Sequence, residues 1–469
     1  MGQNNLKNEA SFIEACQRVA EDIQNIDTNL PIFIFSHFDA DGLTAASILL
    51  IALSQAGFTL HLKIVERLEY ETVKNLNNSL PKGCTIIFSD IGTGILDAFL
   101  DFEQSFKIFI LDHHSLSSEI DLPRNIKFLN PHSYSLNGTT DVSGAGIAYF
   151  VSKQINPQNQ KLAPLALIGA LGDRQDQGEH SSFIGLNDLI VKDALELKMV
   201  SNNVTVWFFD RSRSIDLAIK GSRFSGIEND IDIRNFIDNL EIPRMKRNKQ
   251  RTFYDLNEEE KRLLASELIV NYGIDANEIY KHDYQLINEE TLLLKDARVF
   301  ATKLNACGKS QRSDIGIALC LGDRNEALRD LRSIEQDYKK QISQSLNWAL
   351  SEGNLQELSA IHYLDGRLTI NDRIIGTIVS MISARRDIGP KPVLGCAKIS
   401  SGKIKISMRI SRSQEKEINL SQLLTRVIQE VEPDSEVGGH SAAAGAIISE
   451  SSLHEFIKLI DQLVLEGMN

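Results

Sequence analysis

The sequence contains no apolar run long enough to cross a membrane, because polar residues interrupt each run before the ~18 residues that a bilayer requires. Its first residues, MGQNNLKNEASF, do not follow the pattern of a secretory signal peptide. Cysteine is scarce: the five cysteines are scattered and form no CxxC pair, which gives no support to a disulfide framework or a zinc knuckle. We therefore expect a soluble, cytoplasmic protein with reduced cysteines and no membrane association.

Positive charge is also in deficit, with a formal net charge of -13. This balance argues against a protein whose whole surface grips duplex nucleic acid. Three local basic stretches stand out, and each is more typical of a solvated surface than of a nucleic-acid contact. They are Arg211 with Arg213, RMKRNKQR at 244–251, and Arg385 with Arg386. A cluster of metal-binding carboxylates would itself contribute to the negative charge.

Strand-like and helical patterns alternate in the first half of the chain. PIFIFS (31–36), TIIFSD (85–90) and KIFILDHH (107–114) have the composition of buried strands, whereas 42–58 and 95–104 have helical patterns. This rhythm is typical of βαβ units and predicts an α/β fold with a parallel sheet that is buried on both faces. The length of 469 residues favours two or three domains.

The remaining patterns predict four segments. Residues 1–188 form the core of the first domain, and 189–297, which is more charged, forms a helical insertion or lid. Residues 298–350 complete this domain and supply a long amphipathic connecting helix. Residues 351–469 form a smaller mixed α/β domain, with strand-like patterns at 367–373 (RLTINDR) and 392–411 and a glycine-rich turn at 436–449.

Acidic and imidazole side chains follow all three predicted strands, where ligands of parallel sheets bind. Such clustered carboxylates repel one another unless a cation offsets their charge. Carboxylate and imidazole donors suit manganese, and magnesium less well, and the absence of a nearby cysteine disfavours structural zinc. Two ions would activate water and hold a phosphoryl group. The candidate donors are His37, Asp39, Asp41, Asp90, Asp112, His113 and His114, with Asp173 at the end of an apolar helix; as alternatives, Asp41 is only an N-cap and Asp173 a plain helix end.

The ordered motifs HFDADG, SDIG, LDHH, GALGDR and GGHSAAAGA resemble those of the DHH phosphoesterase superfamily, and within it the RecJ-like nucleases of the archaeal type. The resemblance covers about residues 30–180 and 298–450. It implies a parallel-sheet DHH domain joined by a long helix to a DHH-associated domain. It also implies two manganese ions: His37 and Asp39 bind one, Asp41, Asp173 and His113 bind the other, and Asp90 bridges them.

The resemblance assigns the catalytic pair Asp112 and His114. Asp112 orients His113 as a supporting carboxylate, because a ligating imidazole needs its second nitrogen held. His114 faces the scissile phosphate as a hydrogen-bond donor or acid; a core histidine bonded to backbone is the alternative. KLNACGK (303–309) also resembles the family's NAxGR segment, with Lys309 in place of arginine, and its role stays open.

A second set of residues is predicted to bind the substrate. Gly438 and Gly439 permit a tight turn, after which the small residues 441–445 would let a helix N-terminus approach a phosphate. His440 and Arg409 can donate hydrogen bonds to the same phosphate. Close packing alone is the alternative explanation of these small residues. Bacterial relatives carry an additional oligonucleotide-binding barrel that this chain has no room for. We therefore expect either weaker binding of long nucleic-acid strands or a partner protein that contributes to this binding.

The resemblance implies a metal-dependent exonuclease that degrades single-stranded DNA or RNA to nucleotides in replication or repair. The family resemblance favours degradation in the 5′ to 3′ direction. The residues themselves indicate neither the direction of degradation nor a preference for DNA or RNA. One alternative is a phosphodiesterase for short oligonucleotides or cyclic dinucleotides, which the acidic charge favours and the large insertion disfavours. Another is a replication-fork scaffold, which the intact donor set disfavours. A partnership with the GINS replication complex is implied by resemblance alone.

Overall fold

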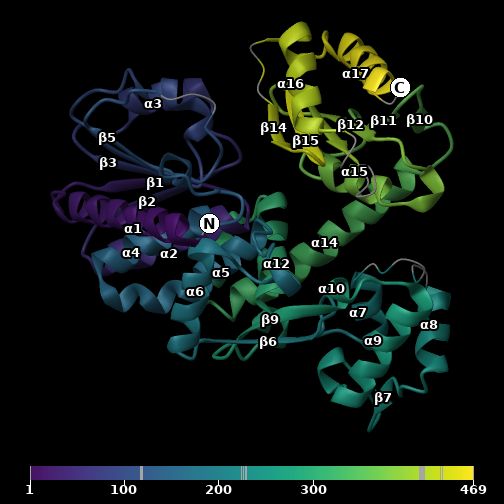
Figure 1. Ribbon diagram of the computed structural model, residues 1–469. Helices are drawn as coiled ribbons and strands as arrows, with labels where there is room; N and C mark the ends of the chain where they lie inside the picture. Colours follow the sequence, from purple (N-terminus) through teal and green to yellow (C-terminus); the bar gives the residue numbers. More distant parts are fainter. Residues whose placement is uncertain are drawn as a thin grey trace. The chain divides into compact units, whose positions relative to one another are not determined.

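Two compact units make up the chain, Met1–Leu331 and Arg332–Asn469. The computed structural model describes residues 2–116, 120–222, 224, 227, 230–410, 418–433, 435 and 437–467 (Figure 1). The boundary between the units falls inside α14 (Glu326–Ala349), the long amphipathic helix that the sequence predicts. None of the helices in the described ranges combines the length and apolar character that crossing a membrane requires.

The first unit is built on a five-stranded sheet in which every pairing is parallel. The strands are β1 (Ile32–His37), β2 (Leu60–Val65), β3 (Thr85–Ser89), β4 (Lys107–Leu111) and β5 (Ile126–Leu129), in the order β2-β1-β3-β4-β5. The three predicted strands are β1, β3 and β4, so the predicted α/β fold is confirmed. The sequence did not reveal the two edge strands: β2 alternates with exposed residues, and β5 has only four residues.

Helices cover both faces of this sheet. α1 (Gly2–Gln24), α2 (Ala40–Gln55) and α4 (Gly144–Ile155) contact its strands, and α5 (Ala163–Gly172) packs on α2 and α4. On the other face, α3 (Tyr70–Ser79) and η1 (Thr93–Phe99) enclose an apolar cluster with Phe35, Phe88 and Ile110. The helix predicted at 95–104 is wrong, because η1 is a short 3-10 segment that is kinked at Ile95.

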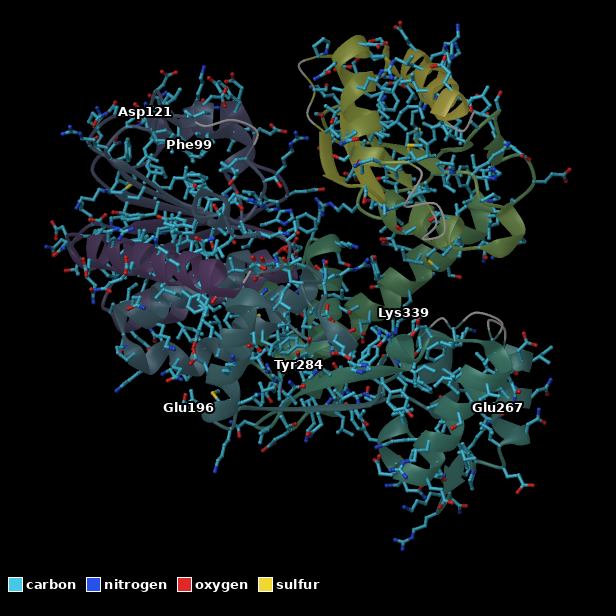
Figure 2. All side chains as sticks on the ribbon, in the orientation of Figure 1. Phe99, Asp121, Glu196, Glu267, Tyr284 and Lys339 are labelled. Atoms are coloured by element: carbon cyan, nitrogen blue, oxygen red, sulfur yellow. The ribbon has the colours of Figure 1, made fainter. Side chains whose placement is uncertain are left out.

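The rest of the first unit contains the predicted insertion. Its elements are α6 (Gly185–Glu196), β6 (Val200–Val206), α7 (Ile215–Ser222), α8 (Asp230–Asn239), β7 (Met245–Lys246), β8 (Lys249–Gln250), α9 (Glu258–Tyr272), α10 (Ala276–Ile279), β9 (Tyr280–Leu286) and α11 (Leu292–Lys295). Helices predominate, but β6 and β9 also form an antiparallel ribbon. Tyr284 of β9, labelled in Figure 2, is buried against Phe183. A separate apolar core that includes Phe208, Phe236 and Leu264 holds the segment together.

Two helices complete the first unit after the insertion. They are α12 (Ala297–Lys309) and α13 (Ser313–Cys320), and both pack on α2. α12 also packs on α5. It therefore lies against the two helices that carry the predicted donors Asp41 and Asp173.

The second unit is a mixed sheet with helices on its two faces, as the sequence predicts. The strands are β10 (Leu355–Glu357), β11 (His362–Asp365), β12 (Val393–Lys398), β13 (Ile404–Arg409), β14 (Val437–His440) and β15 (Ala443–Ile448), in the order β10-β11-β12-β13-β15-β14. Only β11 and β12 pair in parallel. α15 (Ile375–Ser383) packs in one apolar cluster, and α16 (Leu420–Val431) and α17 (Leu453–Gly467) in another.

Two local predictions in this unit are wrong. RLTINDR at 367–373 forms turns, because Thr369 and Ile370 both donate backbone hydrogen bonds to the Gly366 carbonyl. Residues 443–445, predicted to start a helix, instead begin β15 and pair with β14 in a hairpin. Their small side chains therefore line a sheet, and they offer no helix N-terminus to a phosphate.

Candidate metal centre

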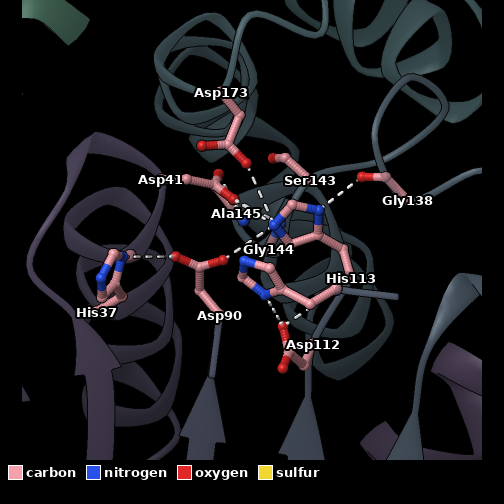
Figure 3. A network of polar contacts seen from close by, with 12 residues as sticks. His37, Asp41, Asp90, Asp112, His113, Gly138, Ser143, Gly144, Ala145 and Asp173 are labelled. Atoms are coloured by element: carbon pink, nitrogen blue, oxygen red, sulfur yellow. Dashed lines mark hydrogen bonds and ion pairs between the residues drawn. The ribbon is translucent and has the colours of Figure 1, made fainter. Parts of the chain in front are cut away.

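The predicted donors gather at the carboxyl ends of β1, β3 and β4 (Figure 3). The strand order reverses between β1 and β3, and sheets of this order bind ligands in the crevice beside that switch point. His37 ends β1, and Asp90 follows β3 directly. The topology thus brings together donors that are separated by more than one hundred residues along the chain.

The loop after β1 is shaped by helix capping. Asp39 is the N-cap of α2, where its Oδ1 accepts a hydrogen bond from Gly42 N at 3.0 Å, and its Oδ2 lies 2.9 Å from His37 Nδ1. A Cβ on Gly42 would lie 2.4 Å from the His37 carbonyl oxygen, so only glycine fits. Burial raises the pKa of Asp39, but His37, the Gly42 N–H and His114 together outweigh burial, and the pKa falls below its ordinary value. Asp39 is therefore an ionised carboxylate beside an imidazole.

Asp41 is fully buried against a different helix. Its Oδ2 accepts a hydrogen bond from Gly144 N at 2.7 Å and its Oδ1 accepts one from Ala145 N at 3.0 Å. These amides begin α4, whose N-terminus carries partial positive charge. Burial, followed by the charge of Asp173, nevertheless raises the pKa of Asp41 to about 7. Asp41 thus caps α4 rather than its own helix, and it is held rigidly.

Asp90 lies between two histidines. Its Oδ2 is 3.9 Å from His37 Nδ1 and its Oδ1 is 3.1 Å from His113 Nε2. The backbone at Asp90 is left-handed, with φ 61°, a conformation that a non-glycine residue adopts rarely and often at functional sites. Gly144 packs so closely that a Cβ there would lie 2.7 Å from Asp90 Oδ1. Burial, followed by the charges of nearby aspartates, holds the pKa of Asp90 well above its ordinary value.

The His113 ring joins the centre to the backbone behind it. Its Nδ1 lies 2.6 Å from the Gly138 carbonyl oxygen, which can only accept, so Nδ1–H donates and Nε2 faces the carboxylates. Nε2 lies 3.2 Å from Asp173 Oδ2 and 3.7 Å from Asp41 Oδ2. Burial lowers the pKa of His113, but Asp173 and Asp90 outweigh burial and raise it well above the ordinary value. In the absence of a cation, these carboxylates therefore favour the protonated form of the ring.

The donors form overlapping groups, within each of which the ligand atoms lie within 4.8 Å of one another. The groups are His37, Asp39 and Asp90; Asp41, His113 and Asp173; and Asp90, Asp112, His113 and His114. Asp90 Oδ1 and His113 Nε2 are buried, and although they face each other, neither makes a hydrogen bond of acceptable geometry among the described residues. Buried oxygen and imidazole donors without such bonds fit a divalent cation.

Asp112 supports His114 and not His113, which corrects the pairing implied by the family resemblance. Its Oδ1 lies 2.7 Å from His114 Nδ1, and its Oδ2 accepts a hydrogen bond from Thr93 N at 2.8 Å. Burial raises the pKa of Asp112, but His114, His113 and the Thr93 N–H together outweigh burial and hold the pKa below the ordinary range. The His114 side chain is 56% exposed whereas that of Asp112 is 1% exposed, so the buried carboxylate fixes one nitrogen of an accessible ring.

We expect Asp112→Asn to lower turnover by about 10–100-fold, the usual effect of removing a partner that orients a functional histidine. The amide can still accept from Thr93 N but no longer carries the charge that holds His114 Nδ1–H. Steady-state rates and manganese titration of parent and variant check this. Asp101→Asn, at an exposed position outside the centre, is the matched control. A variant that loses manganese affinity and turnover equally would contradict the orienting role.

The sequence interpretation missed the backbone and amide groups that hold the donors. Gln175 is buried, and its Nε2 donates to the Gly138 carbonyl at 2.9 Å, while Asn187 Nδ2 donates to Gln175 Oε1. Asn130 is buried, and its Nδ2 donates to the His114 carbonyl at 3.0 Å. Gln175 stands in the polar stretch GDRQDQG, and Asn130 and Asn187 each lie between apolar and polar residues, so no local pattern singles these positions out.

The predicted substrate-binding residues lie in the second unit. Arg409 of β13 donates from Nε to Ser380 Oγ and from Nη1 to the Met408 carbonyl. Gly439 has a left-handed backbone, with φ 120°, and a Cβ there would lie 2.3 Å from the Ala443 carbonyl oxygen. A Cβ on Gly438 would meet nothing within 4 Å. The His440 backbone pairs with Ala443, but its side chain lies outside the described residues.

The basic stretches are largely committed to internal ion pairs. Arg211 is buried and contacts Asp283 and Asp296, and Arg251 contacts Glu260. Arg385 pairs with Asp387, and the side chain of Arg386 lies outside the described residues. Lys246, Arg247 and Lys249 are exposed at the β7–β8 hairpin. Ion pairs also hold Arg213 and Arg244, so five of the seven arginines in these stretches contact carboxylates of the same unit.

Comparisons with known proteins agree with the geometry. A family model described as the DHH family, N-terminal domain, matches residues 31–170, and one described as the DHHA1 domain matches residues 360–466. An uncharacterized protein of Methanocaldococcus jannaschii is 28% identical over 454 residues, which cover 93% of this chain and 94% of that protein.

Two solved structures share the fold. RecJ from Thermus thermophilus, in complex with Mn2+, matches with a TM-score of 0.58 and 17% identity over 97% of this chain, which spans 55% of the RecJ chain. CDC45 from Entamoeba histolytica matches with a TM-score of 0.62 and 13% identity, over 97% of this chain and 99% of that chain. One family model matches each unit, and the chain is therefore a member of the DHH superfamily whose fold resembles that of RecJ.

Proposed function

We propose that this protein is a metal-dependent exonuclease that degrades single-stranded nucleic acid, DNA or RNA, to nucleotides. The observation that carries the proposal is the pair of donor groups around Asp90 and His113, whose buried Oδ1 and Nε2 are suited to a cation. His37, Asp39 and Asp90 would hold one ion, and Asp41, His113 and Asp173 the other, with Asp90 shared. Manganese is the expected ion, since imidazole joins the carboxylates, and magnesium is a weaker substitute.

The bound ions would supply the Lewis acidity and the activated water that phosphodiester hydrolysis needs. The chain's own residues complete the chemistry. Asp112 holds Nδ1 of the accessible His114 ring, which leaves Nε2 to donate a proton or hydrogen bond to a phosphate oxygen. Rigid capping of Asp39 and Asp41 keeps both ligand carboxylates in place without substrate. The fold that the chain shares with RecJ, which was solved with Mn2+, supports this proposal.

Two other functions remain in competition. A replication-fork scaffold is favoured by the CDC45 likeness, which extends over nearly the whole of both chains. The GINS association, which the family resemblance alone implies, belongs with this scaffold function. The complete donor set argues for catalysis instead. A phosphodiesterase for short oligonucleotides or cyclic dinucleotides is favoured by the acidic charge and by the ion pairs that hold five of the seven arginines in the basic stretches.

One assay separates the three functions. Purified protein with manganese is given 5′-labelled and 3′-labelled single strands of several lengths, blunt duplex, closed single-stranded circles and cyclic dinucleotides, with a chelator as the control. We expect degradation of single strands from the 5′ end and almost none of duplex or circle, because an acidic surface holds duplex weakly. Cutting of circles would exclude an exonuclease. Preference for dinucleotides would favour the small-substrate enzyme, and no hydrolysis of any substrate would favour the scaffold.

Arg409→Ala is expected to weaken binding of a short single strand by about tenfold, within the range for losing a charge-assisted hydrogen bond. Manganese affinity should not change, because all the proposed ligands lie in the other unit. Arg409→Lys should restore binding only in part, since lysine lacks the planar fork. Equilibrium binding and calorimetry check this. Arg373→Ala, an arginine of the same unit, is the matched control, and equal strand affinity in parent and Arg409→Ala would contradict the assignment.

A further inference from the structure

The last turn of α12 contacts the metal-ligand loop directly. Asn305 Oδ1 accepts a hydrogen bond from Ala40 N at 2.9 Å, across 265 positions of the chain. Ala40 is the first residue of α2, so its N–H has no partner within the helix. It also lies between Asp39 and Asp41, the two carboxylates assigned to different ions. The Asn305 side chain therefore accepts the hydrogen bond of the peptide N–H that lies between the two ligand residues.

Gly308, one turn further along α12, meets the same loop. A Cβ at this position would lie 1.9 Å from the Phe38 carbonyl oxygen and 2.8 Å from Phe38 Cδ2. Real Cβ atoms do not approach so closely, so the loop or the helix would have to move. The backbone of Gly308 is ordinary helix, and close approach rather than a special conformation explains the glycine.

α12 is also fixed at its other end. Asp296 is its N-cap, with Oδ1 accepting from Arg298 N at 2.9 Å, and Asp296 Oδ2 accepts from Trp207 Nε1 at 2.9 Å and from Arg211 Nη2 at 2.8 Å. Trp207 and Arg211 belong to the insertion and are buried. Because both ends of the helix are held, Asn305 and Gly308 present a rigid surface to the loop.

We propose that Asn305 and Gly308 are positioning residues that clamp the 38–40 backbone and thereby set the geometry of Asp39 and Asp41. This proposal gives a role to two residues of the KLNACGK segment (303–309), and the role of Lys309 stays open. The inference rests on the proposed function only in that the loop binds metal; it does not depend on which substrate is cut. It predicts that α12, which supplies no ligand itself, controls metal affinity.

The test uses the full chain without substrate. Asn305→Leu keeps the approximate size of the side chain but removes the acceptor, and Asn305→Asp retains an acceptor. Thr302→Ala alters an exposed position on the same helix and is the control. Hydrogen exchange of the 38–43 peptide is measured in the metal-free protein, and manganese affinity is measured by calorimetry. Thermal unfolding establishes that each variant is folded.

We expect Asn305→Leu to exchange faster at 38–43 and to bind manganese about 10–100-fold more weakly, as other losses of a ligand's supporting hydrogen bond do. Asn305→Asp should exchange like the parent in that peptide, and Thr302→Ala should match the parent in both measurements. Gly308→Ala should reproduce the Asn305→Leu result if it folds, and Asn305→Leu carries the test if it does not. Parent-like exchange and affinity in Asn305→Leu would overturn the clamp. A parent that binds no manganese would refute the metal centre, whereas the exchange data would still decide whether the clamp exists.

Discussion

Asp90→Asn is expected to lower turnover at least about 100-fold, beyond the usual effect of losing a ligand's supporting bond, and to stabilise the metal-free protein. Asp90 is the carboxylate that we propose the two ions share, and its side chain is 2% exposed. Its pKa is held well above the ordinary value, so folding disfavours the ionised carboxylate that the unfolded chain carries at neutral pH. Asparagine has the same shape and removes that cost.

The expected loss of turnover and the expected gain in metal-free stability have opposite signs, so general damage to the fold cannot explain both. Thermal unfolding should occur at a higher temperature in metal-free Asp90→Asn than in the parent, with a difference that grows as pH rises above about 4. Added manganese should raise the unfolding temperature of the parent and have little effect on that of the variant. Asp97→Asn, at an exposed position of the following η1 segment, is the matched control. Turnover within a few-fold of the parent at saturating manganese would refute the shared-ligand assignment.

Manganese affinity is expected to rise steeply with pH, by about tenfold per pH unit for each proton that the metal displaces. Burial, followed by the charge of Asp173, raises the pKa of Asp41 to about 7, and the pKa of Asp90 lies well above its ordinary value for similar reasons. The carboxylates around His113 raise its pKa as well. Near pH 6 the metal-free centre therefore holds protons that a cation must replace.

The stability of the metal-free protein should change in the opposite direction. A carboxyl whose folded pKa is raised binds more protons in the folded state, so its contribution to stability falls as pH rises from about 4 to about 7, by up to about 1.4 kcal/mol per pH unit. A raised His113 pKa likewise gives stability below about 6.5 that is lost at higher pH. Asp39 and Asp112 have lowered pKa values, and their contribution is lost only below about pH 4.

Calorimetric titration with manganese at about pH 5.5 and about pH 7.5, in two buffers of different ionisation enthalpy, counts the displaced protons. We expect at least one proton at the lower pH and fewer at the higher pH. Urea unfolding of the metal-free protein over the same range should show declining stability. Binding without proton release, together with stability that does not fall with pH, would contradict the raised pKa values of the centre.

The sequence by itself determined the α/β class and the edge of the sheet where the chemistry lies. The strands β1 and β3 end in His37 and Ser89, and Asp112 directly follows β4. Parallel strands bring such ends together at one edge of the sheet. The mixed character of the second unit followed equally from its strand-like and helical runs. Strands β2 and β5 were not predicted, because their edge position and short length remove the continuous apolar pattern.

Only the tertiary structure decided how each donor is held. The Gly138 carbonyl accepts a hydrogen bond from His113 and so fixes the tautomer of that ring, and Asp112 contacts His114. Asn305 accepts a hydrogen bond from Ala40, which lies 265 positions earlier in the chain. These are hydrogen bonds between residues whose spacing along the chain carries no periodicity, so no local pattern encodes them. Residues 437–448 of the glycine-rich segment form a hairpin, since the pairing of β15 with β13 outweighs the local preference of small residues.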